Sequence, residues 1–145
     1  MHFVDIEATT REIDAAAVSV EAQESANLHL YERALQLQSD GGGAEAAELY
    51  TDLLAQRLVA SAEAEKREQG ASLRLKFLAL KNLAQIEEER GNNQRALERL
   101  LQAIQLEQED AVLWQRLGVM AVRTRRAHLA RHAFEHAVIA SPHLQ

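Results

Sequence analysis

The chain has 145 residues, 47% hydrophobic and 26% charged, with no cysteine and a formal net charge of −6. This composition excludes a disulfide framework and thiolate chemistry, and no apolar run approaches the roughly 20 residues that a membrane span needs. No signal peptide is visible near the start, so we expect an intracellular protein of one domain. The 26 alanines, 21 leucines and single proline predict an all-helical fold.

The charge is unevenly distributed along the chain. Residues 1–52 carry 11 acids and 2 bases, residues 53–110 carry 10 and 9, and residues 111–145 carry 1 and 5. The five C-terminal arginines are Arg116, Arg123, Arg125, Arg126 and Arg131. Because acids outnumber bases overall, we expect no direct nucleic-acid binding.

In chain order, the pattern begins with an acidic arm, residues 1–22, that we expect to be partly disordered or helical. Thr9 and Glu12 have the spacing of a capping box that would open a helix there. Helices are then predicted near 23–38, 44–66, 72–90, 94–107, 111–124 and 127–140. Gly41 to Gly43 and Gly91 to Asn93 form the predicted turns within the first two helix pairs.

The sequence repeats itself. A shift of 34 residues places Leu80 on Trp114, Leu83 on Leu117, Ala84 on Gly118, Ala96 on Ala130, Leu100 on Phe134, Ala103 on Ala137 and Ile104 on Val138. A shift of 50 places Leu30 on Leu80, Ala34 on Ala84, Gly41 on Gly91, Ala46 on Ala96, Tyr50 on Leu100 and Leu54 on Ile104. Since 50 is 34 plus 16, about sixteen residues are inserted between the first and second units. A repeat of this length predicts stacked pairs of antiparallel helices, with an ordinary four-helix bundle as the alternative.

Small residues in each unit predict close packing of its two helices. Gly118 and Ala130 would let the backbones approach, while Trp114 and Phe134 would fill the space above and below, and Pro142 would end the last helix. The complete set of predicted packing residues is Leu83, Ala84, Ala96, Ala103, Trp114, Leu117, Gly118, Ala130, Phe134, Ala137 and Pro142.

The last unit resembles the tetratricopeptide repeat, which has Trp114, Leu117, Gly118, Ala130, Phe134, Ala137 and Pro142 at its pattern positions. Ala121 replaces the usual tyrosine, and the middle unit has Gln108 where the proline would be. The resemblance implies a right-handed α-solenoid of about three repeats over residues 23–145. We place repeat 1 at about 27–60, the insertion at about 61–76, repeat 2 at 77–110 and repeat 3 at 111–144.

A closer resemblance follows from the long joint and from residues without a packing role. The segments that carry it are Ala34 to Gln38, Ala47 to Leu54, Lys81 to Gln85, Leu113-Trp114 and Leu129 to Glu135. They are similar to the N-terminal segment of the calcineurin-binding protein cabin family, the large subunit of the HIRA histone chaperone complex. This resemblance implies a nuclear, non-catalytic scaffold for replication-independent nucleosome assembly, with other HIRA-complex subunits and histones as partners. Calcineurin binding lies far C-terminal in that family and is not carried onto any residue here.

The end of the last helix offers an apolar surface. Leu129, Val138 and Ile139 are not followed by a polar capping helix. We therefore expect the chain to be a piece of a longer protein and to self-associate, as a homodimer, through this end.

Three histidines, His128, His132 and His136, recur every four residues on one helix stripe. Such spacing can ligate zinc, but the inward-facing Ala130 and Phe134 predict that the stripe points mostly outward as a solvated or interface surface. We predict no metal site and no cofactor.

No catalytic motif is present, because the chain has no G-x-S-x-G, phosphate-binding glycine loop or dinucleotide fingerprint. Glu87, Glu88 and Glu89 are adjacent, and adjacent helical residues splay by about 100 degrees, which predicts a solvated face rather than a carboxylate pair.

The alternative function is a co-chaperone-like adaptor that clamps the terminal carboxylate of a peptide. Asn82 and Arg116 match two of the five clamp positions, while Tyr31, Leu35 and Val112 replace the other three.

First-helix residues should line the inner surface of the stack and form the partner groove. The predicted groove consists of Tyr31, Leu78, Lys81, Asn82, Gln85, Val112, Gln115, Arg116, Val119 and Arg123. Its basic and apolar groups suit a partner with acids and aliphatic anchors, whereas the acidic first unit suits a basic partner such as a histone tail. These faces could instead pack against further repeats of the same protein or against its own N-terminal arm.

Overall fold

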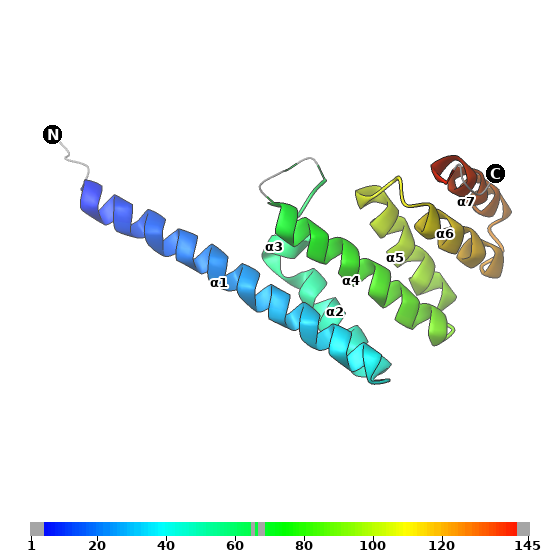
Figure 1. The fold of residues 1–145 in the computed structure, drawn as a ribbon, viewed down its shortest axis with the longest axis horizontal. Coiled ribbons are helices and arrows are strands. Elements are labelled where there is room, and N and C mark those ends of the chain that lie inside the picture. The colour runs from blue at the N-terminus through cyan, green and yellow to red at the C-terminus, as the bar shows by residue number, and fades with distance from the viewer. Residues whose placement is uncertain (1–4, 65, 67–68, 142–145) are drawn as a thin grey trace.

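The computed structural model describes residues 5–64, 66 and 69–141, without the side chains of 13–18. Its helices are α1 (Ile6–Ser39), α2 (Gly43–Ala55), α3 (Arg57–Ala60), α4 (Gly70–Glu89), α5 (Asn93–Leu106), α6 (Ala111–Arg123) and α7 (Ala127–Ala140). Three antiparallel pairs, α1/α2, α4/α5 and α6/α7, stack side by side (Figure 1). No strand occurs within the described ranges.

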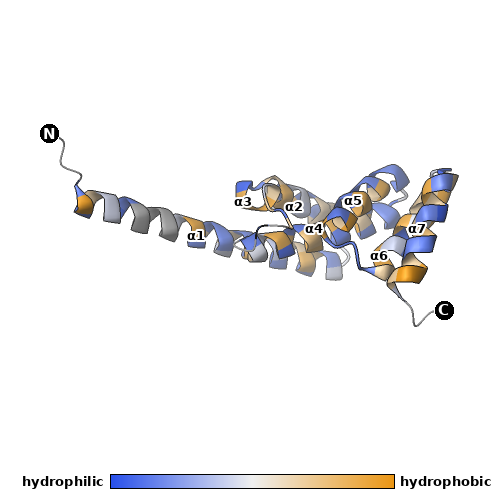
Figure 2. Cartoon of the chain, turned by 90° about the horizontal axis from the view of Figure 1, so that it is seen from above, coloured by the Kyte–Doolittle hydropathy of each residue, from blue (hydrophilic) through white to orange (hydrophobic). Residues whose placement is uncertain are grey.

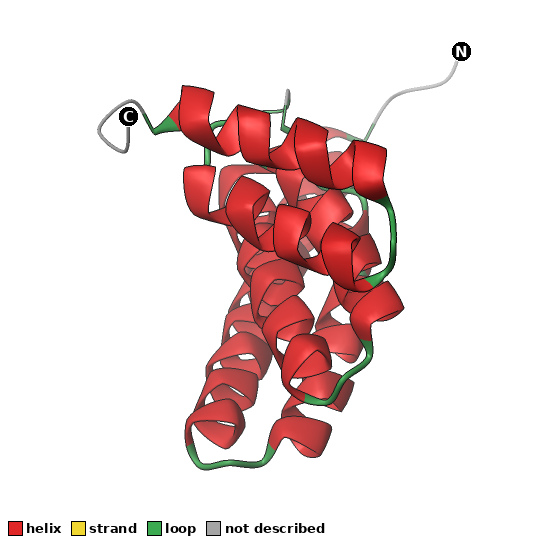
Figure 3. Cartoon of the chain, turned by 90° about the vertical axis from the view of Figure 1, so that its right-hand side faces the viewer, coloured by secondary structure: helices red, strands yellow, loops and turns green. Residues whose placement is uncertain are grey.

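The pairs are arranged so that their first helices share one side. Seen from above, α1, α4 and α6 lie along one side of the stack, and α2 and α5 lie along the other (Figure 2). Seen from the end, the last pair runs across the view while the pairs behind it run steeply (Figure 3). Successive pairs are therefore rotated relative to one another, and the stack twists as repeat arrays do.

Helix α1 is much longer than predicted, because it begins at Ile6 rather than near residue 23. Asp5 caps it, with a carboxylate oxygen 3.0 Å from the backbone nitrogen of Ala8. The Thr9 capping box is wrong, since Thr9 lies inside the helix and its hydroxyl donates to the Asp5 carbonyl. No glycine or proline interrupts the chain between Asp5 and Asp40, so nothing ends the helix earlier. Its N-terminal half extends away from the stack (Figure 1).

The predicted helix over 44–66 is also wrong, because it breaks at Gln56, whose backbone is extended (ψ 136°). The chain then turns through α3, which allows Val59 and Ala62 to be buried. A straight helix would carry these residues past the end of the stack into water. The Lys76 ammonium donates to the carbonyls of Ala60 (3.0 Å) and Ala62 (3.1 Å), which ties the inserted joint to α4. The other four helices begin and end within two residues of their predicted bounds.

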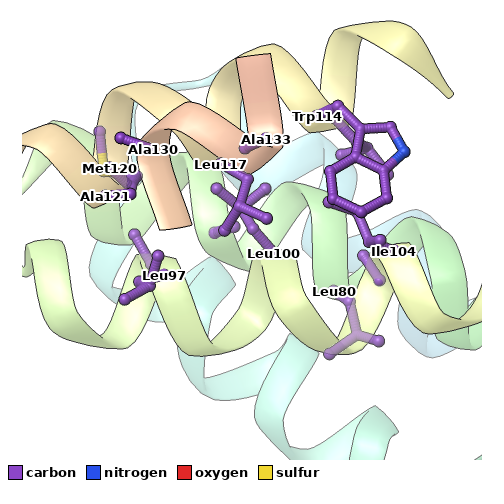
Figure 4. Close-up of a cluster of buried hydrophobic side chains, with 14 of the residues drawn as sticks. Leu80, Leu97, Leu100, Ile104, Trp114, Leu117, Met120, Ala121, Ala130 and Ala133 are labelled. Atoms are coloured by element: carbon purple, nitrogen blue, oxygen red, sulfur yellow. The ribbon is translucent and has the colours of Figure 1, made fainter. Parts of the chain in front are cut away.

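Helix α4 contributes to both halves of the hydrophobic core. Ala79, Leu83 and Ile86 pack with α1 and α2, in a cluster that includes the fully buried Tyr50 and Leu53. On its other side, Phe77, Leu80 and Ala84 pack with α5, α6 and α7. Figure 4 shows this second cluster, with Leu97, Leu100 and Ile104 of α5 facing Trp114, Leu117, Met120 and Ala121 of α6 and Ala130 and Ala133 of α7. Because the three pairs share these side chains, no pair has a core of its own.

The turn within each helix pair has the same geometry three times. Gly41, Gly91 and Arg125 adopt positive φ angles of 85°, 78° and 61°. In each turn, the next backbone N–H bonds the carbonyl five residues earlier, as in Gly42 to Leu37 (2.7 Å) and Arg126 to Ala121 (2.8 Å). This is the helix-ending arrangement that favours glycine at the positive-φ position. The third turn has an arginine there, and its backbone is strained.

We predict that Arg125→Gly raises the free energy of unfolding by roughly 0.5–1 kcal/mol, since relief of the left-handed strain exceeds the extra entropy of glycine in the unfolded chain. Gly91→Ala should lower it by a similar amount, although no atom lies within 4 Å of the added Cβ. Urea denaturation measures both changes. Gly70→Ala, at a glycine without positive φ, is the control; a loss of stability there as large as at Gly91 would contradict the backbone explanation.

Candidate functional site

The predicted groove residues lie on α1, α4 and α6, but they form two hollows rather than one groove. Tyr31 and Leu78 line a hollow of about 660 Å³ between α1 and α4, which we call the α1/α4 hollow. A second hollow of about 460 Å³, the α4/α6 hollow, is lined by Val112, Gln115, Arg116, Val119 and Arg123 together with Glu88, Glu89 and Met120. The remaining three predicted residues, Lys81, Asn82 and Gln85, lie on the stretch of α4 between the two hollows.

Asn82 is the polar centre of the contact between the first two helix pairs. Its side-chain amide donates to the hydroxyls of Tyr31 (3.4 Å) and Tyr50 (3.3 Å), and Tyr50 donates to the Gln38 side-chain oxygen at 2.8 Å. The two tyrosine rings lie 6.1 Å apart. Burial raises the pKa of Tyr50 to about 12, with the nearby Tyr31 adding to the shift, although the Asn82 hydrogen bond opposes it. Asn82 thus joins α4 to both α1 and α2.

Two ion pairs join α4 to α6. Arg116 lies 2.9 Å from a carboxylate oxygen of Glu88 and is also near the Lys81 carbonyl, while Lys81 lies 3.8 Å from Asp110. Arg116 and Glu88 are both mostly buried. Removing one partner would leave a poorly solvated charge, so the pair fixes the position of α6 against α4 at the wall of the α4/α6 hollow.

These contacts bear on the carboxylate clamp. Asn82 and Arg116, the two residues that match the clamp pattern, already bond Tyr31, Tyr50 and Glu88. The Asn82 amide nitrogen and one Arg116 guanidinium nitrogen are therefore engaged within the protein, and a peptide carboxylate at these atoms would compete with those partners.

The glutamates after Gln85 do not form the solvated face that the sequence predicted. Glu87 is buried and accepts a hydrogen bond from the Asn92 amide at 2.7 Å, which closes the turn after α4. Glu88 pairs with Arg116, and Glu89 is exposed. The three side chains do splay apart, as successive helix positions require.

The histidine stripe points outward at His128 and His132, which are exposed, whereas His136 is half-buried. His136 stacks on Trp114, with ring centroids 4.4 Å apart and planes at 17°, and His132 meets the same ring edge-on at 5.9 Å. His132 and His136 therefore lie against the tryptophan, while His128 has no such ring contact among the described residues. Trp114 also donates from its indole nitrogen to the Gln108 carbonyl at 2.7 Å, at the position where the repeat pattern has proline. In the part of the chain that the structure describes, no group of three His, Asp or Glu side chains is placed to hold a metal ion.

Most of the predicted packing residues are buried, but Phe134 is not. Leu83, Ala84, Ala96, Ala103, Trp114, Leu117, Gly118 and Ala130 are buried, Ala137 is half-buried, and Pro142 lies outside the described residues. Phe134 is 37% exposed, and its ring lies against Gly118, where an added Cβ would come within 2.6 Å of it. The tight approach at Gly118 thus accommodates the Phe134 ring, while the histidines occupy the place beside Trp114.

The C-terminal end exposes the apolar residues predicted for self-association. Val138 and Ile139 are exposed and Leu129 is half-buried. Self-association through these residues stays a prediction. Among the described helices, none is long and apolar enough to cross a membrane.

Sequence reasoning missed several residues of these hollows. Leu28 and Leu75 line the α1/α4 hollow with Glu21 and Glu24, and Glu88 lines the α4/α6 hollow. The signal for Leu28 was present, because it precedes Tyr31 by three residues on the same helix face. The position of Glu88 depends on how far α6 approaches α4, which no local pattern specifies.

Comparison with known proteins places the chain in a family. The profile described as the CABIN1 N-terminal domain matches residues 26–144. The chain belongs to this family. Calcineurin-binding protein 1 of Arabidopsis thaliana is 34% identical to it over 141 residues, covering 92% of the chain and 7% of that protein. The cabin resemblance seen in the sequence is therefore confirmed, and the chain spans a small part of the relative's length.

The fold is shared more widely. The C-terminal tetratricopeptide-containing domain of an FK506-binding protein from Plasmodium falciparum superposes with a TM-score of 0.73. It is 13% identical, and the match covers 84% of this chain and 81% of that domain. At this identity the likeness concerns the fold alone, and it confirms the predicted α-solenoid of tetratricopeptide repeats. In the CABIN1 N-terminal domain, this fold places α1, α4 and α6 on one face.

We predict that the stability of the domain falls between pH 10 and about 12 through Tyr50. Its raised pKa means that the unfolded state loses its phenol proton first, so the contribution is intact below pH 10 and is lost as pH rises toward 12. Tyr50→Phe should be less stable than the parent at pH 8, because it loses hydrogen bonds, and should show a shallower decline above pH 10. Denaturant unfolding at pH 8 and 11.5 measures this; parallel declines would contradict the assignment to Tyr50.

Proposed function

We propose that this domain is a non-catalytic protein-interaction scaffold that belongs to a HIRA-type histone chaperone complex and acts in replication-independent nucleosome assembly in the nucleus. The cabin family and the tetratricopeptide fold suggest an interaction module. The specific complex is our proposal from the family resemblance. The chain spans 7% of its curated relative, so partners of the whole protein are proposed here and are not carried onto single residues.

The observation that carries the proposal is the pair of hollows on one face. Both lie between first helices, both are open, and both are walled by contacts that hold their shape, the Asn82 network and the Arg116–Glu88 pair. Prepared surfaces of this kind reduce the ordering cost of binding a protein segment.

The charges of the face suit more than one partner of such a complex. The α4/α6 hollow presents the exposed Arg123 and the apolar Val112 and Val119, which fit an acidic segment with aliphatic anchors. We propose HIRA-complex subunits for this hollow, and histones for the acidic α1 side.

The co-chaperone-like adaptor with a different partner gains less support. Its clamp would need Asn82 and Arg116 to be free for a peptide carboxylate, and both are engaged within the domain. Neither the family nor the fold specifies a chaperone partner.

We predict that the purified domain captures HIRA subunits or histones from nuclear extract, and that Val119→Asp abolishes capture of the HIRA subunits. Val119 lines the α4/α6 hollow, and an aspartate there would oppose an acidic partner and remove an apolar contact. Quantitative mass spectrometry of the captured proteins measures the loss. Arg116 and Lys81 are unsuitable sites for such variants, since they hold α4 and α6 together.

Val122→Asp is the matched control for that experiment. Val122 is an exposed valine on the same helix and does not line the hollow. It should capture partners as the parent does. Recovery of neither HIRA subunits nor histones by the parent would contradict the proposal, and specific recovery of chaperones would favour the adaptor.

A further inference from the structure

The α1/α4 hollow is the larger and more apolar of the two inner hollows. Leu28 and Tyr31 of α1 face Leu75 and Leu78 of α4 across it. Leu28 is 47% exposed and lies one helix turn before Tyr31, which packs against the core. Covering an exposed leucine beside a hollow of about 660 Å³ would remove apolar surface from water and favour binding.

The hollow has the shape of a helix-binding groove. On α1 its lining residues are Glu21, Glu24, Ser25, Leu28 and Tyr31, which extend about 15 Å along the axis at 1.5 Å per residue. On α4 the lining runs from Ala71 to Leu78. The hollow therefore follows two neighbouring helices lengthwise for about two to three turns, enough for anchors spaced i, i+4 and i+7 on a third helix.

The two sides of the hollow differ in charge. Glu21 and Glu24 form its α1 rim, and residues 6–24 of α1 carry five acids and one base. Across the hollow, the Arg74 guanidinium lies over the Phe77 ring at 5.9 Å from its centroid. The negative charge thus lies along the projecting part of α1, where it would attract a cationic partner.

We infer that the α1/α4 hollow binds a basic amphipathic helical segment of a partner protein. Its aliphatic side chains enter between Leu28 and Leu75, and its lysines or arginines face Glu21 and Glu24. The inference rests on the proposed role as a protein-interaction module and specifies the chemistry of the partner on this side of the face.

The test uses synthetic model helices rather than cellular partners. One labelled 16-residue peptide has leucines at i, i+3, i+4 and i+7 with lysines elsewhere, and a second has glutamates in place of the lysines. Fluorescence anisotropy should show saturable binding of the basic peptide and none of the acidic one. Affinity for the basic peptide should fall as salt is raised, because exposed charges are screened.

Variants then locate the binding. Leu28→Ser should weaken the basic peptide about tenfold, since covering a half-exposed leucine is worth roughly the free energy of one decade in Kd. Leu35→Ser is the matched control, because Leu35 is similarly exposed on α1 and does not line the hollow. Both substitutions are at exposed sites, and circular dichroism checks that the fold is kept.

A charge reversal tests the rim separately. Glu21→Lys with Glu24→Lys should reduce affinity at least tenfold, whereas Glu45→Lys with Glu48→Lys, at exposed acids of α2, changes the net charge equally and should have little effect. Equal effects of the two pairs, or equal effects of Leu28→Ser and Leu35→Ser, would overturn the inference as non-specific attraction to an acidic protein. Absence of binding by the basic peptide would overturn it directly.

This outcome is separable from that of the proposed function. The peptide assay contains no histone or HIRA subunit, so a domain that binds the basic helix in the hollow but captures neither keeps this inference and loses the chromatin role. The reverse result removes the hollow as the binding site and leaves the scaffold proposal intact.

Discussion

The polar contact around Asn82 determines how the first helix pair sits on the second. The Asn82 amide donates hydrogen bonds to two tyrosines on two different helices. One of these, Tyr50, is fully buried and donates a hydrogen bond to the Gln38 side-chain oxygen. A buried hydroxyl without such partners would carry a large desolvation cost, so the arrangement accepts only one relative position of α1, α2 and α4. Apolar contacts alone would tolerate sliding of the pairs. Tyr31, which bonds Asn82, also lines the α1/α4 hollow, so this contact helps to fix the position of the hollow's wall.

Beyond that contact, the stack depends on small residues and on three equivalent turns. Ala34, Ala84 and Gly118 occupy corresponding positions on the first helices, and all three are buried. The positive-φ residues Gly41, Gly91 and Arg125 are separated by 50 and 34 residues, the same shifts that relate the sequence units. The turn geometry and the sequence periodicity therefore define the same repeated unit. The insertion after the first unit is held against α4 by the hydrogen bonds of Lys76.

The sequence predicted this unit well because its signals are local. Spacing of small and large residues located four helices closely, and the family resemblance followed from residues on their surfaces. Prediction from the sequence failed where contacts with residues distant along the chain determine the local structure. Gln56 breaks a helix so that Val59 can be buried, Glu87 turns inward to bond Asn92, and His136 stacks on a tryptophan of the preceding helix. The groove residues lie on α1, α4 and α6, but they line two hollows separated along α4, a division that no periodic pattern encodes.

Binding is therefore assigned to the face made by α1, α4 and α6, while α2 and α5 pack behind these helices. Hydroxyl-radical footprinting of the domain, alone and with a bound partner, tests this claim most directly. We expect protection of Leu28, Leu78, Val112 and Val119 on the inner face, with unchanged labelling of Leu49 on α2 and Leu101 on α5. Protection confined to α2 and α5, with the inner face labelled as in the free domain, would contradict the account.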